Sequence, residues 1–165
     1  MSSNETEAQI KVLIRTRPTQ IFASKNINIS SLDNKINITI PKNESKGLIN
    51  NQKENWTFQF DKILHNVAQE EVFEFVKSII SGATHGFNGT VFAYGQTGSG
   101  KTFTMSGSSS NFNYRGIIPR SITRLFQEIG GKPEYDSHVS ISYLEIYNEI
   151  VFDLLSSLPA NEQKG

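Results

Sequence analysis

The sequence predicts an α/β protein in which a mixed central sheet is flanked by helices, and three patterns support this fold class. The mostly apolar run Ile10–Ile14 is typical of a strand that is covered on both faces of a sheet. Strictly alternating runs between residues 24 and 60 predict half-exposed antiparallel strands. A segment with apolar residues at helical spacing then leads into a further apolar strand.

The first elements follow in order from the N-terminus. Residues 1–8 are polar and predict a flexible N-terminus. The first strand ends at Arg15-Thr16-Arg17-Pro18, since proline cannot donate to a strand ladder. The alternating strands are expected at residues 27–29, 36–40 and 56–60.

A helix is expected to start at Asn66–Gln69, which resembles a capping box, and to run to about His85, with Gly86 as its stop. Its apolar face indicates a helix that packs on the core rather than one that binds a partner. The residues of that face are Val72, Phe73, Phe75, Val76, Ile79, Ile80 and Ala83.

The second half of the chain begins with an expected strand at Thr90–Tyr94. A polar loop at Ser106–Asn111 interrupts the following helix, and a second helix is expected over residues 117–129, with Pro119 in its first turn. A long strand is then expected at Val139–Tyr147, with a short apolar segment at residues 151–155.

Gly95–Thr102 reads Gly-Gln-Thr-Gly-Ser-Gly-Lys-Thr, which matches the phosphate-binding-loop pattern G-x-x-x-x-G-K-[ST]. Because glycine adopts backbone angles closed to other residues, Gly95, Gly98 and Gly100 let the chain pass close to phosphate oxygens. Successive N–H groups then converge on the anion, and the next helix points its positive end at it. An apolar strand before the loop and helical sequence after it favour a true motif over a chance match.

Two residues of this loop have specific expected roles. Lys101 is expected to reach the β- and γ-phosphates, and the hydroxyl of Thr102 is expected to ligate Mg²⁺. The loop residues predicted to bind nucleotide are Gly95, Gln96, Thr97, Gly98, Ser99, Gly100, Lys101 and Thr102.

Composition narrows the remaining function classes. The chain has 165 residues, enough for one domain with a core, and its formal net charge of +0 gives no electrostatic case for nucleic acid or an anionic membrane. Without cysteine it has neither disulfides nor thiolate metal sites, and its histidines (His65, His85 and His138) lack ligand spacing. No signal peptide or membrane-length apolar run is present, so an intracellular protein is expected.

The run Phe87–Met105 resembles the phosphate-loop signature of kinesin motor domains and is far more specific than the loop pattern alone. Three further blocks resemble this family in order and spacing: Ile10–Pro18, Arg115–Arg120, and Ser142–Glu149 with Asp153–Leu155. The resemblance covers roughly residues 10–155. It implies a P-loop NTPase fold of kinesin type that is incomplete in this chain, with a partial motor domain at 9–156 and a polar C-terminal tail at 157–165. The sequence around Gly47–Phe60, especially Asn50-Asn51, is similar to that of a kinesin branch associated with cilia and flagella.

The resemblance implies ATP or ADP with Mg²⁺ as ligands, and it places Arg15, Arg17 and Pro18 on the adenine side of the pocket. Phe103 falls where many kinesins place a ring against the base, and stacking suits a flat purine, although a role in the helix core stays open. Ser106–Tyr114 corresponds to the family's helix-interrupting loop, where composition alone indicates only a surface loop. Residues 2–9 correspond to a cover strand or are a frayed terminus.

Hydrolysis also needs loops that sense the γ-phosphate and an acidic residue linked to Mg²⁺. The family's switch segments, of the types Asn-x-x-Ser-Ser-Arg-Ser-His and Asp-Leu-Ala-Gly-Ser-Glu, do not occur in this sequence. The main microtubule-contacting segments, the neck linker and a dimerising coiled coil are not found either. None of the late acidic residues ends a fully apolar strand, so no catalytic residue is assigned among Asp136, Glu145, Glu149 and Asp153.

In the topology that the resemblance implies, the phosphate-loop strand lies between two strands that come later in the chain. Thr90–Tyr94 is therefore expected to have both edges unpaired here, which exposes backbone donors and acceptors. We expect this chain alone to have weak or no ATPase activity.

Three functions compete. The leading hypothesis is the N-terminal part of a kinesin motor domain, a family that couples ATP hydrolysis to movement along microtubules in the cytoplasm and cytoskeleton, with a cilium or flagellum as the branch resemblance implies. The second is a non-catalytic module that binds nucleotide or tubulin without turnover. The third is another small P-loop enzyme such as a nucleotide kinase, which would need an Arg-rich lid and a Walker B strand.

Overall fold

The computed structural model describes residues 10–42 and 53–159. The chain divides into two compact units, Met1–Glu128 and Ile129–Gly165. The expectations for residues 1–8 and for Asn50-Asn51 lie outside the described residues, as does most of the predicted tail.

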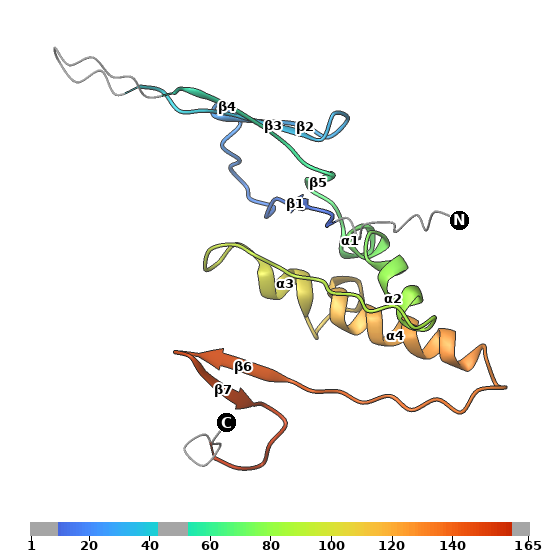
Figure 1. The fold of residues 1–165 in the computed structure, drawn as a ribbon. Coiled ribbons are helices and arrows are strands. Elements are labelled where there is room, and N and C mark those ends of the chain that lie inside the picture. The colour runs from blue at the N-terminus through green and yellow to red at the C-terminus, as the bar shows by residue number, and fades with distance from the viewer. Residues whose placement is uncertain (1–9, 43–52, 160–165) are drawn as a thin grey trace, which may run out of the picture. The chain divides into compact units, whose positions relative to one another are not determined.

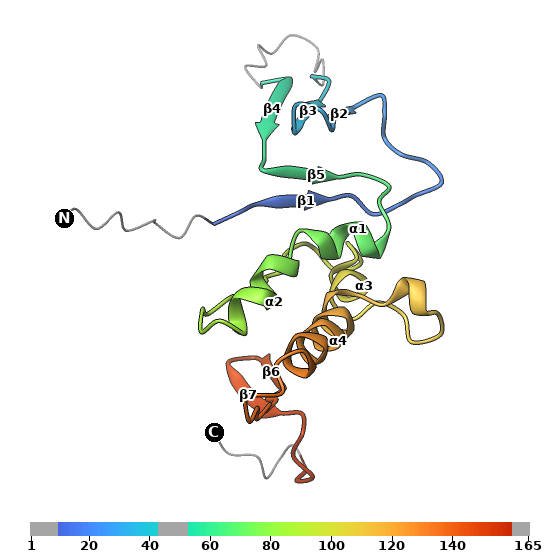
Figure 2. The ribbon, with the colours of Figure 1, turned by 90° about the vertical axis from the view of Figure 1, so that its right-hand side faces the viewer.

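In the first unit, β1 (Leu13–Arg15) pairs in parallel with β5 (Lys62–Leu64), and Figures 1 and 2 show the two strands side by side. The Asp61 carboxylate accepts a hydrogen bond of 2.7 Å from the Val12 N–H, while the Asp61 N–H donates to the Val12 carbonyl at 3.1 Å. The sequence did not predict β5, because three residues between an aromatic strand and a helix are too few to show a period.

A three-stranded antiparallel sheet confirms the alternating pattern. It has the order β2 (Ile27–Ser30), β3 (Lys35–Thr39) and β4 (Asn55–Gln59). Successive side chains in a strand point to opposite faces, so the cross-strand register gathers the apolar residues on one face. These residues are Ile27, Ile29, Ile36, Ile38, Trp56 and Phe58.

The expectation of one continuous helix from the Asn66–Gln69 start to about His85 is wrong. The structure has α1 (Gln69–Glu74) and α2 (Lys77–Ala83), separated at Phe75 and Val76. The N–H groups of Phe75 and Val76 donate to carbonyls only three residues back, at Val72 and Phe73, which tightens the turn. The capping contact lies at Ala68 and Glu71 rather than at Asn66 and Gln69: the Ala68 N–H donates to the Glu71 carboxylate at 3.1 Å. The second helix ends at Ala83, and Gly86, the expected stop, has φ of 87°.

The core of the first unit lies where β5, α1 and the start of α4 (Ile117–Gly130) meet. Its buried members are Leu64, Val72, Phe73, Val76 and Ile117, with Leu13, Val67, Ile79, Val91 and Met105 packed against them. Phe75, expected on the buried face, is 41% exposed and lies at the break between α1 and α2.

Residues 87–94 lead from α2 to the phosphate loop without forming a strand. Phe92 is 82% exposed and Tyr94 is 90% exposed. Among the described residues, no sheet includes this segment. The expected strand Thr90–Tyr94 is thus absent as a regular element.

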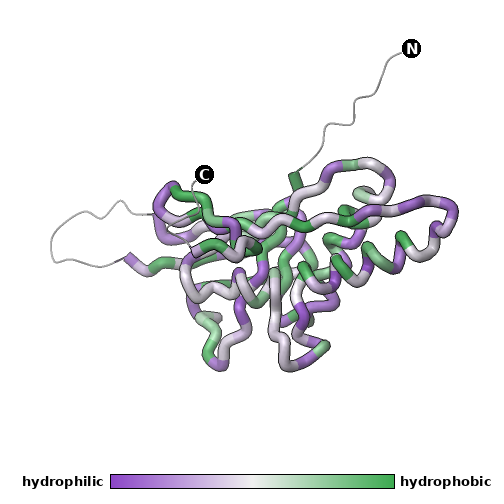
Figure 3. Tube along the Cα trace, turned by 90° about the horizontal axis from the view of Figure 1, so that it is seen from below, coloured by the Kyte–Doolittle hydropathy of each residue, from purple (hydrophilic) through white to green (hydrophobic). Residues whose placement is uncertain are grey.

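After the loop comes α3 (Lys101–Met105), then a short 3-10 helix η1 (Phe112–Tyr114), then α4. This confirms the interrupted helix. An antiparallel bridge between Gly107 and Arg115 closes the base of the intervening loop. Apolar and polar positions alternate along the helical turns in Figure 3, as expected for helices with one apolar face.

In the second unit, β6 (Leu144–Tyr147) and β7 (Ile150–Asp153) form a hairpin with Tyr147 opposite Ile150. The long strand expected at Val139–Tyr147 is therefore too long, because pairing begins only at Leu144. The short apolar segment after Glu149 is the partner strand. Within the described ranges of the chain, no helix is long and apolar enough to cross a membrane.

Candidate functional site

The backbone of Gly95–Thr102 turns sharply through glycines and enters α3 at Lys101. Gly98 has φ of 80° and Gly100 has φ of 103°, angles that L-residues rarely adopt. The Ser99 N–H donates to the Gln96 carbonyl at 3.1 Å and closes a turn inside the loop. In the described structure, the N–H groups of Gly98 and Gly100 take part in no hydrogen bond, so they remain available to an anion.

The Lys101 amine bonds to its own loop. Its Nζ donates to the carbonyl of Gly95 at 2.8 Å and to that of Gln96 at 3.0 Å. Both acceptors are neutral carbonyls, and a phosphate oxygen is a stronger partner for an ammonium group. The amine is thus held at the loop in a bond that an anion can replace.

Arg17 connects the end of β1 to the phosphate loop. Its Nη1 donates to the Gly98 carbonyl at 2.6 Å, across 81 positions of sequence. The structure therefore brings the Arg-x-Arg-Pro stretch to the loop. Pro18 follows in an exposed stretch of chain.

Arg15 lies beside α3. Its Nη1 donates to the Gln69 side-chain oxygen at 2.7 Å and to the Thr104 hydroxyl at 3.0 Å. The guanidinium carbon is 5.6 Å from the centre of the Phe103 ring, a distance at which a cation is attracted to an aromatic face. Burial lowers the pKa of the Arg15 guanidinium, which still remains charged near neutral pH.

Phe103 is partly accessible. Its ring is tilted against that of Tyr114, with centroids 6.3 Å apart, and 41% of the residue is exposed. Neither alternative for Phe103 is excluded, because the ring has packing neighbours and a free surface. Thr102 is exposed at the second position of α3, with a side chain that solvent reaches.

The remaining predicted loop residues, Gln96, Thr97 and Ser99, lie on the same turn, and Gln96 and Thr97 are exposed. The late acidic residues Asp136, Glu145, Glu149 and Asp153 belong to the second unit. Across the described ranges, no three His, Cys, Asp or Glu residues form a group that could hold a metal ion.

Sequence reasoning did not single out Gln69, Thr104 or Tyr114. Each contacts the Arg15–Phe103 pair, through the hydrogen bonds to Arg15 or the ring contact with Phe103. Gln69 falls within the expected helix start, and a glutamine there resembles any polar first-turn residue. Only the three-dimensional contact identifies it.

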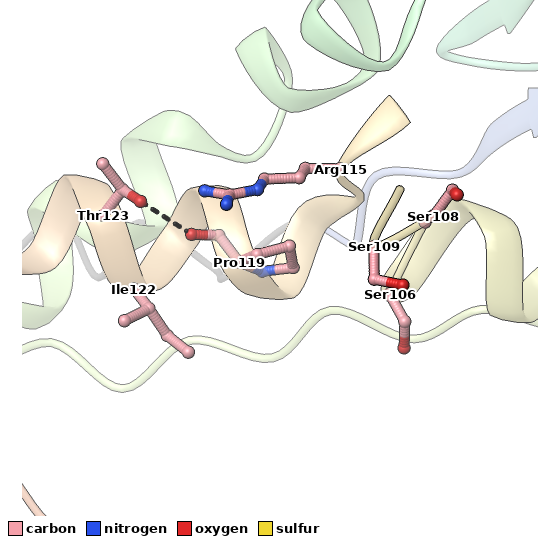
Figure 4. A pocket seen from close by; sticks show the side chains of 8 residues that line it. Ser106, Ser108, Ser109, Arg115, Pro119, Ile122 and Thr123 are labelled. Atoms are coloured by element: carbon pink, nitrogen blue, oxygen red, sulfur yellow. Dashed lines mark hydrogen bonds between the residues drawn. The ribbon is translucent and has the colours of Figure 1, made fainter. Parts of the chain in front are cut away.

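A surface pocket of about 570 Å³ lies elsewhere, between the loop after α3 and the first turns of α4. In Figure 4, Arg115 extends over α4 while Ser106, Ser108 and Ser109 lie at the other end. The Thr123 hydroxyl donates to the Pro119 carbonyl at 3.0 Å. None of the predicted nucleotide-binding residues lines this pocket.

A glycine-rich loop that enters a helix at Lys-Thr, within an α/β fold, defines a protein of the P-loop class. The family model for the kinesin motor domain matches residues 15–164, and the chain belongs to that family.

Curated relatives agree with this assignment. The chain is 44% identical to the mouse protein named kinesin-like protein KIF9 over 155 residues, covering 93% of this chain and 20% of the relative. It is 42% identical to kinesin-like protein KLP1 of Chlamydomonas reinhardtii over 151 residues, covering 91% of this chain and 19% of the relative. The chain thus spans about a fifth of the length of these relatives.

Proposed function

We propose that Gly95–Thr102 binds the phosphates of ATP or ADP. Lys101 contacts the β- and γ-phosphates, and the Thr102 hydroxyl ligates a Mg²⁺ ion that neutralises phosphate charge. Arg15, Arg17, Pro18 and Phe103 line the adenine side.

The arrangement of the loop supports a phosphate ligand. Positive φ angles at Gly98 and Gly100 turn the backbone, and their N–H groups have no hydrogen-bond partner in the described structure. Lys101 bonds only to neutral loop carbonyls among the interactions of the described chain. These donors fit a multiply charged anion better than any neutral ligand.

The observation that carries the nucleotide assignment is the bond between Arg17 and the Gly98 carbonyl at 2.6 Å. It brings the end of β1 to the loop, so a base bound beside Arg15 and a phosphate bound by Lys101 can belong to one molecule. A loop that bound only phosphate would not require Arg15 and Arg17 beside it.

For the whole protein we infer ATP hydrolysis coupled to movement along microtubules, with the cytoskeleton as its location. The resemblance of the sequence around Gly47–Phe60, especially Asn50-Asn51, to a ciliary and flagellar kinesin branch favours a cilium or flagellum. We assign residues 9–156 to the motor domain. Because the sequence contains neither switch segment, the given chain alone is expected to bind ATP with little or no turnover.

The alternative is a non-catalytic nucleotide-binding module, which the missing switch segments favour for this chain. Microtubule-stimulated ATP turnover separates the two functions when measured on this chain and on a version extended to the length of its relatives. Stimulated turnover by the extended version alone supports the motor function. An extended version that does not respond to microtubules contradicts it.

Binding itself is tested by calorimetric titration of Mg-ATP into the chain and into a Lys101→Ala variant. The variant is expected to lose binding, because it removes the ammonium group that the loop holds at the carbonyls of Gly95 and Gln96, where a phosphate oxygen can replace them. Lys25→Ala, at an exposed lysine before β2, is the matched control. Equal affinity in both variants would show that the loop does not bind the phosphates.

A further inference from the structure

Gln69 is an unusual residue for its position. It is the first residue of α1, yet only 3% of it is exposed, and it is the one buried polar residue among those the structure describes. Burying an amide without partners costs roughly 1–3 kcal/mol, so a buried glutamine should be fully engaged.

The Gln69 amide is engaged on both sides and joins three segments. Its oxygen accepts the bond from Arg15 Nη1 at 2.7 Å. Its nitrogen donates to the Phe103 carbonyl at 2.6 Å and to the Tyr114 carbonyl at 3.3 Å. One side chain therefore links β1, α3 and the 3-10 helix η1.

These contacts fix Arg15 without neutralising it. Only neutral oxygens, from Gln69 and Thr104, accept bonds from its guanidinium in the described structure. A carboxylate in the place of Gln69 would hold Arg15 more strongly but would also compensate its charge. A neutral amide leaves that charge available to a ligand, with the guanidinium 5.6 Å from the centre of the Phe103 ring.

We propose that Gln69 is a positioning residue for the base end of the nucleotide site, acting through Arg15 and the backbone of Phe103. This inference rests on the proposed function of Gly95–Thr102. The hydrogen bonds of Gln69 reach Arg15, Phe103 and Tyr114 but no residue of that loop within the described chain. Gln69 therefore determines how well the base is held and leaves phosphate binding to the loop.

The experiment compares two ligands by calorimetric titration in the presence of Mg²⁺: ATP, and inorganic tripolyphosphate, which has the phosphates but no base. For Gln69→Leu, the affinity for ATP is expected to fall at least about tenfold, the factor for one hydrogen bond to a charged group. The affinity for tripolyphosphate should change by less than about twofold. Gln127→Leu, an exposed glutamine on α4, should change neither value.

A second comparison shows whether Gln69 acts through Arg15. Residues that act through one another give non-additive effects, so the combined loss of ATP affinity in Arg15→Leu with Gln69→Leu should be smaller than the sum of the two single losses. Gln69→Glu keeps an acceptor for Arg15 but loses the donor to the Phe103 and Tyr114 carbonyls and compensates the charge of Arg15, so it is also expected to lower the affinity for ATP. It also serves as the test variant if Gln69→Leu does not fold, as judged by circular dichroism.

Several results would overturn the inference. Equal losses for ATP and tripolyphosphate in Gln69→Leu would indicate a purely structural role, and additive effects of the two substitutions would exclude action through Arg15. If the wild-type chain binds ATP and tripolyphosphate equally and Lys101→Ala abolishes the binding of both, the loop binds phosphate as proposed but Gln69 does not position a base. If the wild type binds neither ligand, the proposed function itself is wrong, and this inference falls with it.

Discussion

Replacing Gly100 by alanine tests whether backbone strain, rather than crowding, requires glycine in the phosphate loop. Gly100 precedes α3 with φ of 103° and ψ of 16°, and a Cβ added there would meet no atom within 4 Å. The added methyl group therefore has room, and its only cost is the left-handed backbone conformation. For an L-residue that cost is roughly 1–2 kcal/mol.

Gly130 provides a matched control. A Cβ added to it also meets no atom within 4 Å, but Gly130 ends α4 with a φ outside the left-handed region. Gly130→Ala should leave stability unchanged or raise it by up to about 0.5–1 kcal/mol, because alanine has less conformational freedom to lose on folding. The two substitutions are chemically identical and should have opposite signs.

Urea unfolding followed by circular dichroism measures both free energies. We expect Gly100→Ala to be less stable than Gly130→Ala by about 1–3 kcal/mol, the sum of the two effects. Gly100→Asn should fall between alanine and glycine, because asparagine tolerates the left-handed region better than other L-residues. Equal stability of the Gly100→Ala and Gly130→Ala variants would refute the strain argument.

Three further predictions follow from other contacts. Phe73→Ala removes a ring that is 8% exposed in the core and should lower the free energy of unfolding by about 3–5 kcal/mol, whereas Phe126→Ala, 56% exposed, should cost under about 1 kcal/mol; urea unfolding measures both. The pKa of the Glu128 carboxyl is lowered, chiefly by the hydrogen bond from Ser81, so its contribution is present above the ordinary carboxyl pKa and is lost as pH falls through the lowered one. Urea midpoints between about pH 6 and pH 3 should therefore fall less in Glu128→Gln than in the wild type, and identical slopes would contradict this. Arg17→Ala removes the hydrogen bond to the Gly98 carbonyl and should weaken ATP binding by about threefold to tenfold, as measured by calorimetry. An unchanged dissociation constant for ATP would show that Arg17 does not contribute to the site.

Periodicity in the sequence predicted elements well where one face decides the structure. The alternating isoleucines predicted the half-exposed antiparallel strands β2 and β3, and the helical pattern from Ile117 predicted α4. The same signal failed at Phe75 and Val76, because α1 and α2 share an apolar face across the break and the pattern continues through it. The spacing of apolar residues therefore does not reveal a tightened turn of this kind.

The residues of the candidate site also differ in whether the sequence could predict them. Local chemistry identified the loop, since glycines and a Lys-Thr pair at fixed spacing have a specific use with phosphate. The resemblance to kinesins added Arg15 and Arg17 as predicted adenine-side residues; in the structure Arg17 bonds to the loop at Gly98, whereas Arg15 bonds to Gln69 and Thr104 beside it. Gln69 could not be found in this way, because its importance comes from burial against carbonyls 34 and 45 positions later in the chain.

The exposed segment at residues 87–94 has a thermodynamic consequence for the loop that it precedes. Fixing the backbone of one residue costs roughly 1–2 kcal/mol, and among the described residues no strand pairing supplies that ordering here. A strand that paired with this segment would fix the entry to the loop before a ligand arrived, and so would raise its affinity for phosphate. Linkage is reciprocal, so a bound nucleotide would strengthen the pairing by the same factor. Assembly of the sheet and loading of the loop are thus two coupled equilibria, and each can be measured through the other.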